Sequence, residues 1–290
     1  MIPAAFDYRR PTSLAEAVQL LAVHADEAKI LAGGHSLVPM MKLRLAMPAL
    51  VIDIGRLSEL RGIREHNGTL IIGAGTTQHD AEVSPLLQQH CSLLVETAAA
   101  VGDVQVRNRG TVGGSIAHAD PAADWPAAIL AVGARIKLVR AGGERLVDAA
   151  DFFVDMLTTV MDSQEILTEI HVPVNPPRTG GAYLKVAQPA SGFALTGVAA
   201  QVTLGADQTV QRVAVGITGV SGKAYRAHVT EQVLQGQAAT AETIAQAAEQ
   251  ATAGVEALGD IHASAAYRLH LTRVYTKRAL QQALERAQRA

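Results

Sequence analysis

The chain has 290 residues and a mass of 30.4 kDa, which predicts about two domains at roughly 150 residues each. Hydrophobic residues make up 49% of the sequence and charged residues 18%, and the net charge is −2. This composition is typical of a folded globular protein and excludes the strong positive field that nucleic acids require, so no nucleic-acid partner is expected.

Two further features limit the class of protein. The amino terminus has no signal-peptide pattern, and no apolar run reaches the roughly 20 residues of a membrane-spanning helix, so we expect a cytoplasmic protein without a transmembrane segment. The single cysteine, Cys91, excludes an internal disulfide and any thiolate zinc site or iron–sulfur cluster held by this chain alone. Its apolar helical context is typical of a buried, unreactive thiol.

Helix and strand patterns alternate along the chain, which predicts a mixed α and β protein. Residues Ser13 to Glu16 form a capping-box pattern, and helical spacing of apolar residues continues to about Ala25. Asn67-Gly68 predicts a β-hairpin between apolar runs, and Ala141–Gly143 predicts another between 134–140 and 144–148. Other strands are expected at 29–31, 50–54, 60–65 and 70–73, and helices at about 86–101 and 125–132.

A segment rich in proline and glycine, Val172–Gly181, predicts a domain boundary, because proline removes backbone donors and glycine loosens the chain. We therefore expect one domain over residues 1–174 and a second over 175–290. The second begins with strand patterns at 182–187, 195–204 and 210–218. It ends in segments rich in Ala, Gln and Glu at 224–234, 241–253 and 263–287, which predict helices packed on a small sheet.

Two glycine-rich loops are the clearest candidates for a binding site: Ala32-Gly33-Gly34-His35-Ser36 and Thr111-Val112-Gly113-Gly114-Ser115. Without Cβ atoms, successive N–H groups can converge on an anion such as a pyrophosphate, and hydroxyls in the second loop add donors. A Gly-Gly pair also fits an ordinary tight turn. Neither loop matches the G-x-G-x-x-G fingerprint or the P-loop, which argues against a Rossmann NAD enzyme and an ATPase.

Polar residues near the second loop add to this candidate site. Asp120 and Asp124 fit either acceptors for a ribityl or ribose hydroxyl or caps of the helix that begins at Trp125. His118 fits a surface histidine, and the three side chains together are a poor metal-ligand set. Lys185, in an apolar strand pattern, fits either a side chain that reaches toward a cofactor or one on a solvated strand face.

These motifs resemble the FAD-binding medium subunit of the molybdenum hydroxylases, of the carbon monoxide dehydrogenase and xanthine dehydrogenase type. The first loop is followed by Leu37-Val38-Pro39, and the second, within Arg109–Ser115, is followed by Asp120–Asp124. The resemblance covers nearly the whole chain. It implies an α+β fold, in which a PCMH-type FAD-binding domain of two α/β subdomains precedes a C-terminal domain of a small sheet and helices.

The resemblance also implies the roles of individual residues. Both loops would bind the FAD pyrophosphate and adjoining groups, Asp124 would bind a cofactor hydroxyl, and Lys185 would lie near the flavin ring. Val101 and Leu167 match the apolar positions that flank the isoalloxazine. Many relatives have arginines just after the lysine strand, whereas this chain has Gln188-Pro-Ala-Ser191.

The implied function is electron transfer. FAD on this chain would receive electrons from a [2Fe–2S] cluster on a small partner subunit, and a large subunit would carry the molybdopterin cofactor, in a dimer of heterotrimers. The substrate and the terminal electron acceptor stay open. The alternative is a self-sufficient FAD oxidase or reductase of the same fold, because some related oxidases attach FAD through a histidine after a Gly-Gly pair, as at His35. A subunit that has lost the cofactor is disfavoured by the intact glycines.

Overall fold

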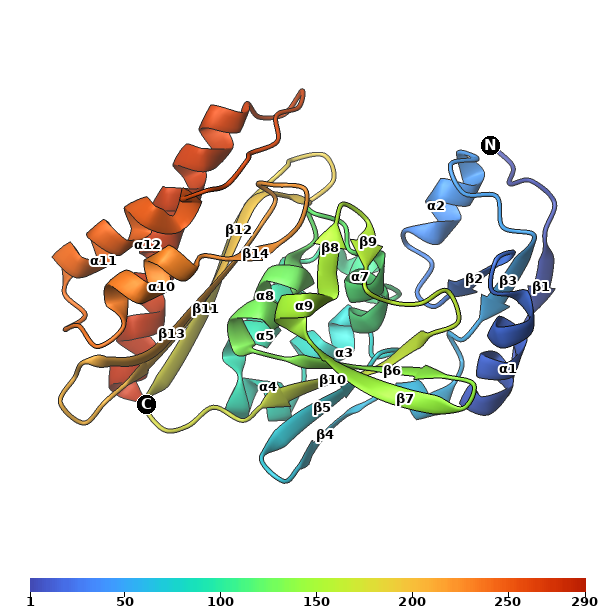
Figure 1. Ribbon diagram of the computed structural model, residues 1–290, viewed down its shortest axis with the longest axis horizontal. Coiled ribbons are helices and arrows are strands. Elements are labelled where there is room, and N and C mark those ends of the chain that lie inside the picture. The colour runs from blue at the N-terminus through green and yellow to red at the C-terminus, as the bar shows by residue number, and fades with distance from the viewer.

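The computed structural model describes residues 1–290 and arranges them around three main sheets with separate apolar cores (Figure 1). We divide the molecule into an N-terminal lobe (residues 1–57), a central lobe (58–174) and a C-terminal lobe (175–290). In Figure 1 the blue N-terminal lobe and the red C-terminal helices lie at opposite ends, with the central lobe between them. The predicted α+β fold is confirmed.

The N-terminal lobe is a small parallel sheet covered by one helix. Its strands lie in the order β1 (Asp7–Arg9), β3 (Leu50–Asp53), β2 (Ala28–Leu31), and α1 (Leu14–His24) buries Ala17, Val18 and Leu21 against them. Half of the predicted capping box is present, since the Ser13 hydroxyl accepts a hydrogen bond from the Glu16 N–H at 3.2 Å. The Glu16 carboxylate accepts from the Thr12 N–H and hydroxyl, at 2.7 and 2.9 Å, instead of from the Ser13 N–H. The first glycine loop follows β2 and leads into α2 (Leu37–Lys42).

The central lobe contains a five-stranded antiparallel sheet and a layer of short helices. The sheet has the order β4 (Ile63–His66), β5 (Thr69–Gly73), β10 (Ile166–Pro173), β6 (Arg135–Arg140), β7 (Gly143–Asp148). Both predicted hairpins are present as β4–β5 and β6–β7. The helices are α3 (Gln78–Glu82), α4 (Pro85–His90), α5 (Ser92–Ala100), α6 (Val104–Arg107), α7 (Val112–His118), α8 (Asp124–Val132) and α9 (Ala149–Phe152). The smallest elements are the 3₁₀ turn η1 (Ser58–Leu60) and the hairpin of β8 (Phe153–Asp155) and β9 (Thr158–Thr159).

The C-terminal lobe is a four-stranded antiparallel sheet between two layers of helices. Its strands are β11 (Thr179–Ala187), β12 (Ala194–Leu204), β13 (Val210–Thr218) and β14 (Tyr225–Arg226), in chain order. The terminal helices α10 (His228–Leu234), α11 (Ala241–Glu249) and α12 (Ala265–Arg289), with the 3₁₀ turn η2 (Gln250–Thr252), lie on one side. Helices α5 and α8 of the central lobe pack on the sheet as well, so every residue of β12 is buried.

Several elements differ from the sequence prediction, which did not include the short elements β1, α3, α6, α7, α9, β8 and β9. The helix expected at 86–101 is two helices, because Cys91 adopts φ −160° and ψ 71° and ends α4. This change of direction lets Leu87 and Leu93 both face the core. Strand β10 was not predicted, although it is the central strand of its sheet. The segment expected as a helix from Ala224 contains β14, and its helix begins only at His228.

Candidate functional site

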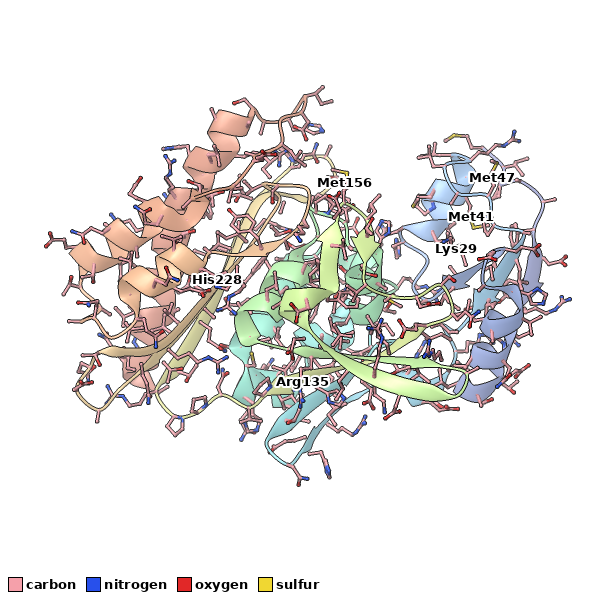
Figure 2. All side chains as sticks on the ribbon, viewed as in Figure 1. Lys29, Met41, Met47, Arg135, Met156 and His228 are labelled. Atoms are coloured by element: carbon pink, nitrogen blue, oxygen red, sulfur yellow. The ribbon has the colours of Figure 1, made fainter.

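A cavity of about 560 Å³ lies where the N-terminal and central lobes meet, within the roughly 300–1,000 Å³ range of small-molecule sites. Figure 2 labels Lys29, which lines the cavity on the N-terminal lobe, and Met156, which precedes the lining residue Leu157 on the opposite side. The predicted site residues that line it are Ala32, Gly33, Gly34, His35, Ser36, Val101, Thr111, Gly113, Gly114, Ser115, Asp124 and Leu167. The two exceptions are Val112, which is buried in the central core, and Lys185, which lies behind Asp124.

The first glycine loop presents a run of unused backbone donors. The N–H groups from Gly33 to Ser36 donate no hydrogen bond within the chain, although the loop carbonyls of Gly34 and Ser36 accept bonds from α2. Gly34 has φ +80°, which favours glycine. A Cβ on Gly33 would lie 2.3 Å from the Arg109 carbonyl oxygen, so the two loops are in backbone contact here. Consecutive free N–H groups at a cavity wall suit an anion.

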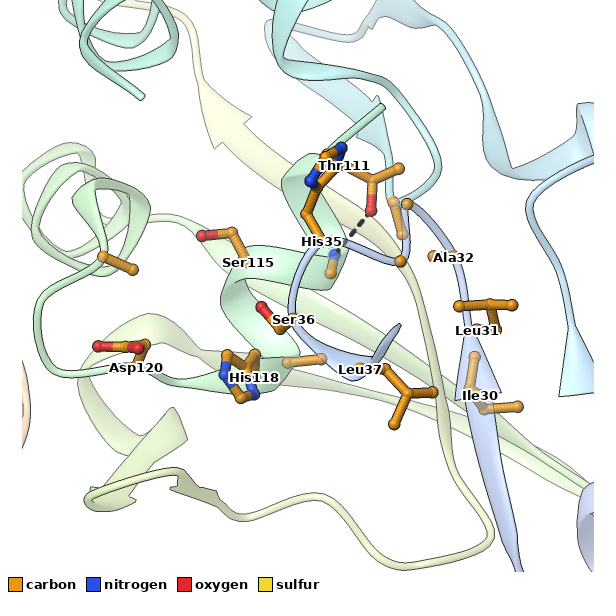
Figure 3. Close-up of a pocket in the computed structure, with 18 of the residues that line it drawn as sticks. Ile30, Leu31, Ala32, His35, Ser36, Leu37, Thr111, Ser115, His118 and Asp120 are labelled. Atoms are coloured by element: carbon orange, nitrogen blue, oxygen red, sulfur yellow. Dashed lines mark hydrogen bonds between the residues drawn. The ribbon is translucent and has the colours of Figure 1, made fainter. Parts of the chain in front are cut away.

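The second loop has the opposite property, since its backbone donors are occupied. The Val112 and Gly113 N–H groups donate to the carbonyls of Thr76 and Ala74, both at 2.9 Å. The Gly114 N–H donates to the Thr111 hydroxyl at 3.1 Å, the dashed bond in Figure 3, and the Ser115 N–H donates to the Thr111 carbonyl. Both segments were expected to be loops that offer backbone donors, but Val112–Ser115 form the first turn of α7, with Thr111 as its N-cap. In the structure the second loop offers its Thr111 and Ser115 hydroxyls instead.

Gln78 positions the second loop, and the sequence analysis did not identify it. Its side-chain amide is buried, where the nitrogen donates to the Thr111 carbonyl at 3.1 Å and the oxygen accepts from the Trp125 indole N–H. The Gln78 backbone N–H also donates to the Gly110 carbonyl at 2.9 Å. A capping box at Thr77 starts α3 and places Gln78 here, but no sequence signal links α3 to a loop more than thirty residues away.

Asp124 is the buried carboxylate of the site. It is 4% exposed, and its Oδ1 accepts from the Tyr183 hydroxyl at 2.5 Å and lies 2.9 Å from the Lys185 ammonium. Burial raises the pKa of Asp124, whereas the Lys185 charge and the Tyr183 hydroxyl oppose that rise. Burial and the neighbouring carboxylate raise the pKa of Tyr183 well above its usual value. Since both partners bind Oδ1, Oδ2 is the oxygen available to a ligand hydroxyl.

Among the remaining polar candidates, Asp120 has a structural partner, and the two histidines lie at the cavity. The Asp120 carboxylate accepts from the Ala122 N–H at 2.8 Å and so closes the turn before α8, whose N-cap is Ala123. His35 is exposed beside the cavity, and His118 lines it (Figure 3).

No cluster of His, Cys, Asp and Glu side chains has the arrangement of a metal site. No helix is both long enough and apolar enough to span a bilayer.

Apolar side chains also line the cavity. Val101, Leu167, Leu157, Met161 and Ile166 of the central lobe contribute, as does Phe193 of the C-terminal lobe. The segment Gln188–Phe193, where relatives were expected to have arginines, is held by Gln188, whose side-chain oxygen accepts from the Ser191 hydroxyl at 2.6 Å. The cavity thus combines free anion donors, a buried carboxylate and apolar walls, a set that fits a dinucleotide with an aromatic ring such as FAD.

The comparisons with known proteins agree with this fit. Residues 4–175 match the family described as the FAD binding domain in molybdopterin dehydrogenase, and residues 181–283 match the CO dehydrogenase flavoprotein C-terminal domain. The chain is 42% identical over 286 residues to the carbon monoxide dehydrogenase medium chain of Hydrogenophaga pseudoflava, covering 99% of both chains. It is 35% identical over 288 residues to the caffeine dehydrogenase subunit beta of a Pseudomonas species, covering 99% of this chain and 97% of that protein.

The solved structures give the same result. The Hydrogenophaga pseudoflava carbon monoxide dehydrogenase that lacks the Mo-pyranopterin moiety contains a chain with a TM-score of 0.96 and 43% identity, with 99% of each chain covered. The reconstituted CO dehydrogenase from Oligotropha carboxidovorans gives 0.95 and 36%, with 99% of this chain and 100% of that chain covered. The chain therefore belongs to the family of FAD-binding medium chains of molybdenum-containing dehydrogenases, and is a subunit of an oxidoreductase.

Proposed function

We propose that this chain carries FAD and transfers electrons within a multi-subunit molybdenum hydroxylase, from a [2Fe–2S] subunit to an external acceptor. The observation that carries the proposal is the run of free N–H groups from Gly33 to Ser36, which faces a cavity with the buried carboxylate of Asp124 in its wall. Bound flavin supplies the chemistry, because it accepts and releases electrons. The residues of this chain hold it, orient it and control access to it.

Each residue of the candidate site has a role in this proposal. The free donors of the first loop, His35 included, bind the pyrophosphate, and the Thr111 and Ser115 hydroxyls add donors from the facing loop. Asp124 accepts from a cofactor hydroxyl through Oδ2. Val101 and Leu167, which line the cavity, flank the isoalloxazine. Val112, Gly113 and Gly114 act through the backbone, by holding α7 against the end of β5.

The partners follow from what this chain lacks. A single buried cysteine cannot hold an iron–sulfur cluster, so the proposal assigns the [2Fe–2S] cluster to a small partner subunit. Similarity to the medium chains of carbon monoxide dehydrogenases supports a large subunit that carries the molybdopterin cofactor. We propose a dimer of these heterotrimers in the cytoplasm. We also propose a domain boundary after residue 174, which is supported by the family matches to residues 4–175 and 181–283 and by the five-residue loop between the end of β10 at Pro173 and the start of β11 at Thr179, which contains Pro176 and Pro177.

The first test is the visible absorption spectrum, with molybdenum and iron content, of the assembly that co-purifies with the tagged chain from its native host. We expect releasable FAD, both metals and two additional polypeptides. Flavin without metals or partners would contradict the proposal and favour the self-sufficient oxidase or reductase. In that case FAD that stays with the denatured chain would indicate covalent attachment, and His35 would be the residue to test by substitution.

The second test addresses the pyrophosphate site. Ser115→Asp places a negative charge on the wall opposite the first loop, whereas Ser115→Asn has nearly the same size without the charge. Two like charges about 5 Å apart repel by about 3 kcal/mol at an effective dielectric constant of about 20, which is roughly a hundredfold in affinity. We expect FAD content to fall in the Asp variant and to persist in the Asn variant. Equal FAD content in both folded variants would remove Ser115 from the pyrophosphate site.

A further inference from the structure

The ammonium group of Lys185 is held by three oxygens of this chain. Its Nζ donates to the Ala100 carbonyl at 2.5 Å and to the Gly192 carbonyl at 2.8 Å, and it forms an ion pair with Asp124 Oδ1 at 2.9 Å. The two carbonyls thus take two of the three N–H donors of the ammonium, and the carboxylate pairs with its charge. The side chain is 7% exposed and does not line the cavity. Lys185 is therefore set back from the cavity and bound to atoms of the protein itself.

The three acceptors come from separate segments that meet at the cavity. Ala100 ends α5 in the central lobe, just before the lining residues Val101 and Gly102. Gly192 lies in the Gln188–Phe193 segment of the C-terminal lobe, and Asp124 is the first residue of α8. Lys185 therefore connects both sides of the lobe boundary beside the cavity.

The two backbone segments that Lys185 connects are also in direct contact. A Cβ on Gly192 would lie 3.3 Å from the Cα of Gly102, and both glycines have positive φ, +74° and +46°. The Gln188–Phe193 segment has its own backbone bonds, from the Gln188 N–H to the Phe193 carbonyl and from the Gly192 N–H to the Gln188 carbonyl. It is thus a preformed turn that the Lys185 ammonium fastens to the end of α5.

We propose that Lys185 is a positioning residue that fastens the Gln188–Phe193 turn to the Ala100–Gly102 segment and so builds the flavin end of the cavity, without itself donating to the flavin. The inference rests on the proposed FAD function. It replaces the expectation of a lysine that reaches toward the ring with one that acts through the two backbone segments. The Asp124 carboxylate supplies the countercharge that makes a buried ammonium tolerable.

The chemistry of the contact requires lysine. An ammonium directs three donors tetrahedrally and can meet three convergent oxygens, whereas the planar guanidinium of arginine cannot present its donors in that geometry. Methionine preserves much of the lysine volume but donates nothing, which leaves two carbonyls and a buried carboxylate without their partner. Both substitutions should therefore loosen the turn.

The experiment uses the flavin-loaded assembly and compares wild type with Lys185→Met, Lys185→Arg and the control Lys223→Met. Lys223 also joins the C-terminal lobe to the central lobe, by donating to the Phe153 carbonyl at 3.1 Å, but it does not line the cavity. The readouts are the rate of FAD release, followed by flavin fluorescence, and deuterium exchange of the Gln188 and Gly192 amides. Both Lys185 variants lose the contacts of the ammonium with buried acceptors. We therefore expect both to release FAD about tenfold faster or more than wild type.

We expect both Lys185 variants to release FAD faster and to exchange these amides faster, and Lys223→Met to match wild type. Unchanged FAD release and unchanged amide exchange in Lys185→Met would overturn the proposal. If the flavin midpoint potential shifts in that variant while release and exchange stay the same, the shift would identify a direct contact between Lys185 and the flavin. Full recovery in Lys185→Arg would overturn the required geometry. If Lys185→Met does not accumulate, Lys185→Gln, which is one bond shorter, serves with the same expectations. Wild type without flavin would instead refute the proposed function.

Discussion

Burial sets the chemistry of single side chains in this protein more than residue type does. Asp124 and Asp120 are four residues apart, yet Asp124 forms a buried contact with Lys185 and Tyr183, while Asp120 closes a turn at the cavity wall. Lys185, which by sequence fitted either a cofactor ligand or a solvated surface residue, is a buried donor to backbone carbonyls. Cys91 is 2% exposed, and burial raises the pKa of its thiol to about 12.

This pKa predicts an unreactive thiol. Because the thiolate is the nucleophile and almost none forms at pH 8, we expect native protein to resist iodoacetamide at that pH. After unfolding in urea the thiol should regain an ordinary pKa and react fully. Mass spectrometry of the intact chain measures both states, and rapid alkylation of the folded protein would contradict the assigned burial.

At the scale of elements, close backbone packing determines how α7 carries the second loop. A Cβ on Gly113 would lie 2.4 Å from the Cβ of Ala74 and 2.8 Å from its carbonyl oxygen, where no flexible side chain can move away. The Gly113 N–H also donates to that carbonyl at 2.9 Å. The glycine therefore lets α7 begin against the end of β5, and this contact fixes the positions of Thr111 and Ser115 at the cavity.

Gly113→Ala should accordingly displace α7. We expect it to lower the free energy of unfolding by about 1–3 kcal/mol, the usual cost of overpacking, and to reduce FAD content. Gly143→Ala is the matched control, since a Cβ there meets nothing within 4 Å and the backbone has no positive φ. Urea unfolding and flavin content measure the two effects. Equal stability of the two variants would show that α7 adjusts without cost.

At the scale of the whole molecule, the lobes are joined by a few specific polar contacts beside the apolar core. Arg286 of α12 pairs with Glu96 of α5 at 2.5 Å.

Within the C-terminal lobe, buried Arg268 of α12 donates to the Leu195 carbonyl at 2.8 Å and to the Asp260 carboxylate at 2.7 Å. Asp260 in turn accepts from the N–H groups of Ala263 and His262, so it ties the loop before α12 to the helix itself.

These bonds predict a pH dependence. The Ala263 and His262 N–H groups, and then Arg268, lower the pKa of Asp260 to about 2. A carboxyl with a depressed folded-state pKa stabilises the fold above its unfolded pKa of about 4, and this contribution is lost as pH falls toward 2. The stability advantage of wild type over Asp260→Asn should therefore shrink between about pH 5 and 2.5, as urea unfolding would measure. Asp151→Asn, at an exposed carboxyl without bonds, should show no such trend.

The sequence by itself determined the local chemistry of this protein. Strand and helix periodicity, the Ser13 cap and both hairpin turns depend on neighbouring residues, so they could be predicted correctly. The glycine loops were recognisable for the same reason, because the absence of Cβ atoms is a property of the residues themselves. Together with the flanking motifs they were sufficient to identify the family.

Only the tertiary structure decided which of these residues act together. The Val112 and Gly113 donors of the second loop are occupied by the carbonyls of Thr76 and Ala74, which belong to another part of the chain. The role of Gln78 and the three acceptors of Lys185 also depend on contacts between residues distant in sequence. Strand β10 and the break at Cys91 escaped prediction because sheet pairing and core packing, rather than local pattern, fix them. Such contacts leave no local pattern in a single sequence, and they define the cavity.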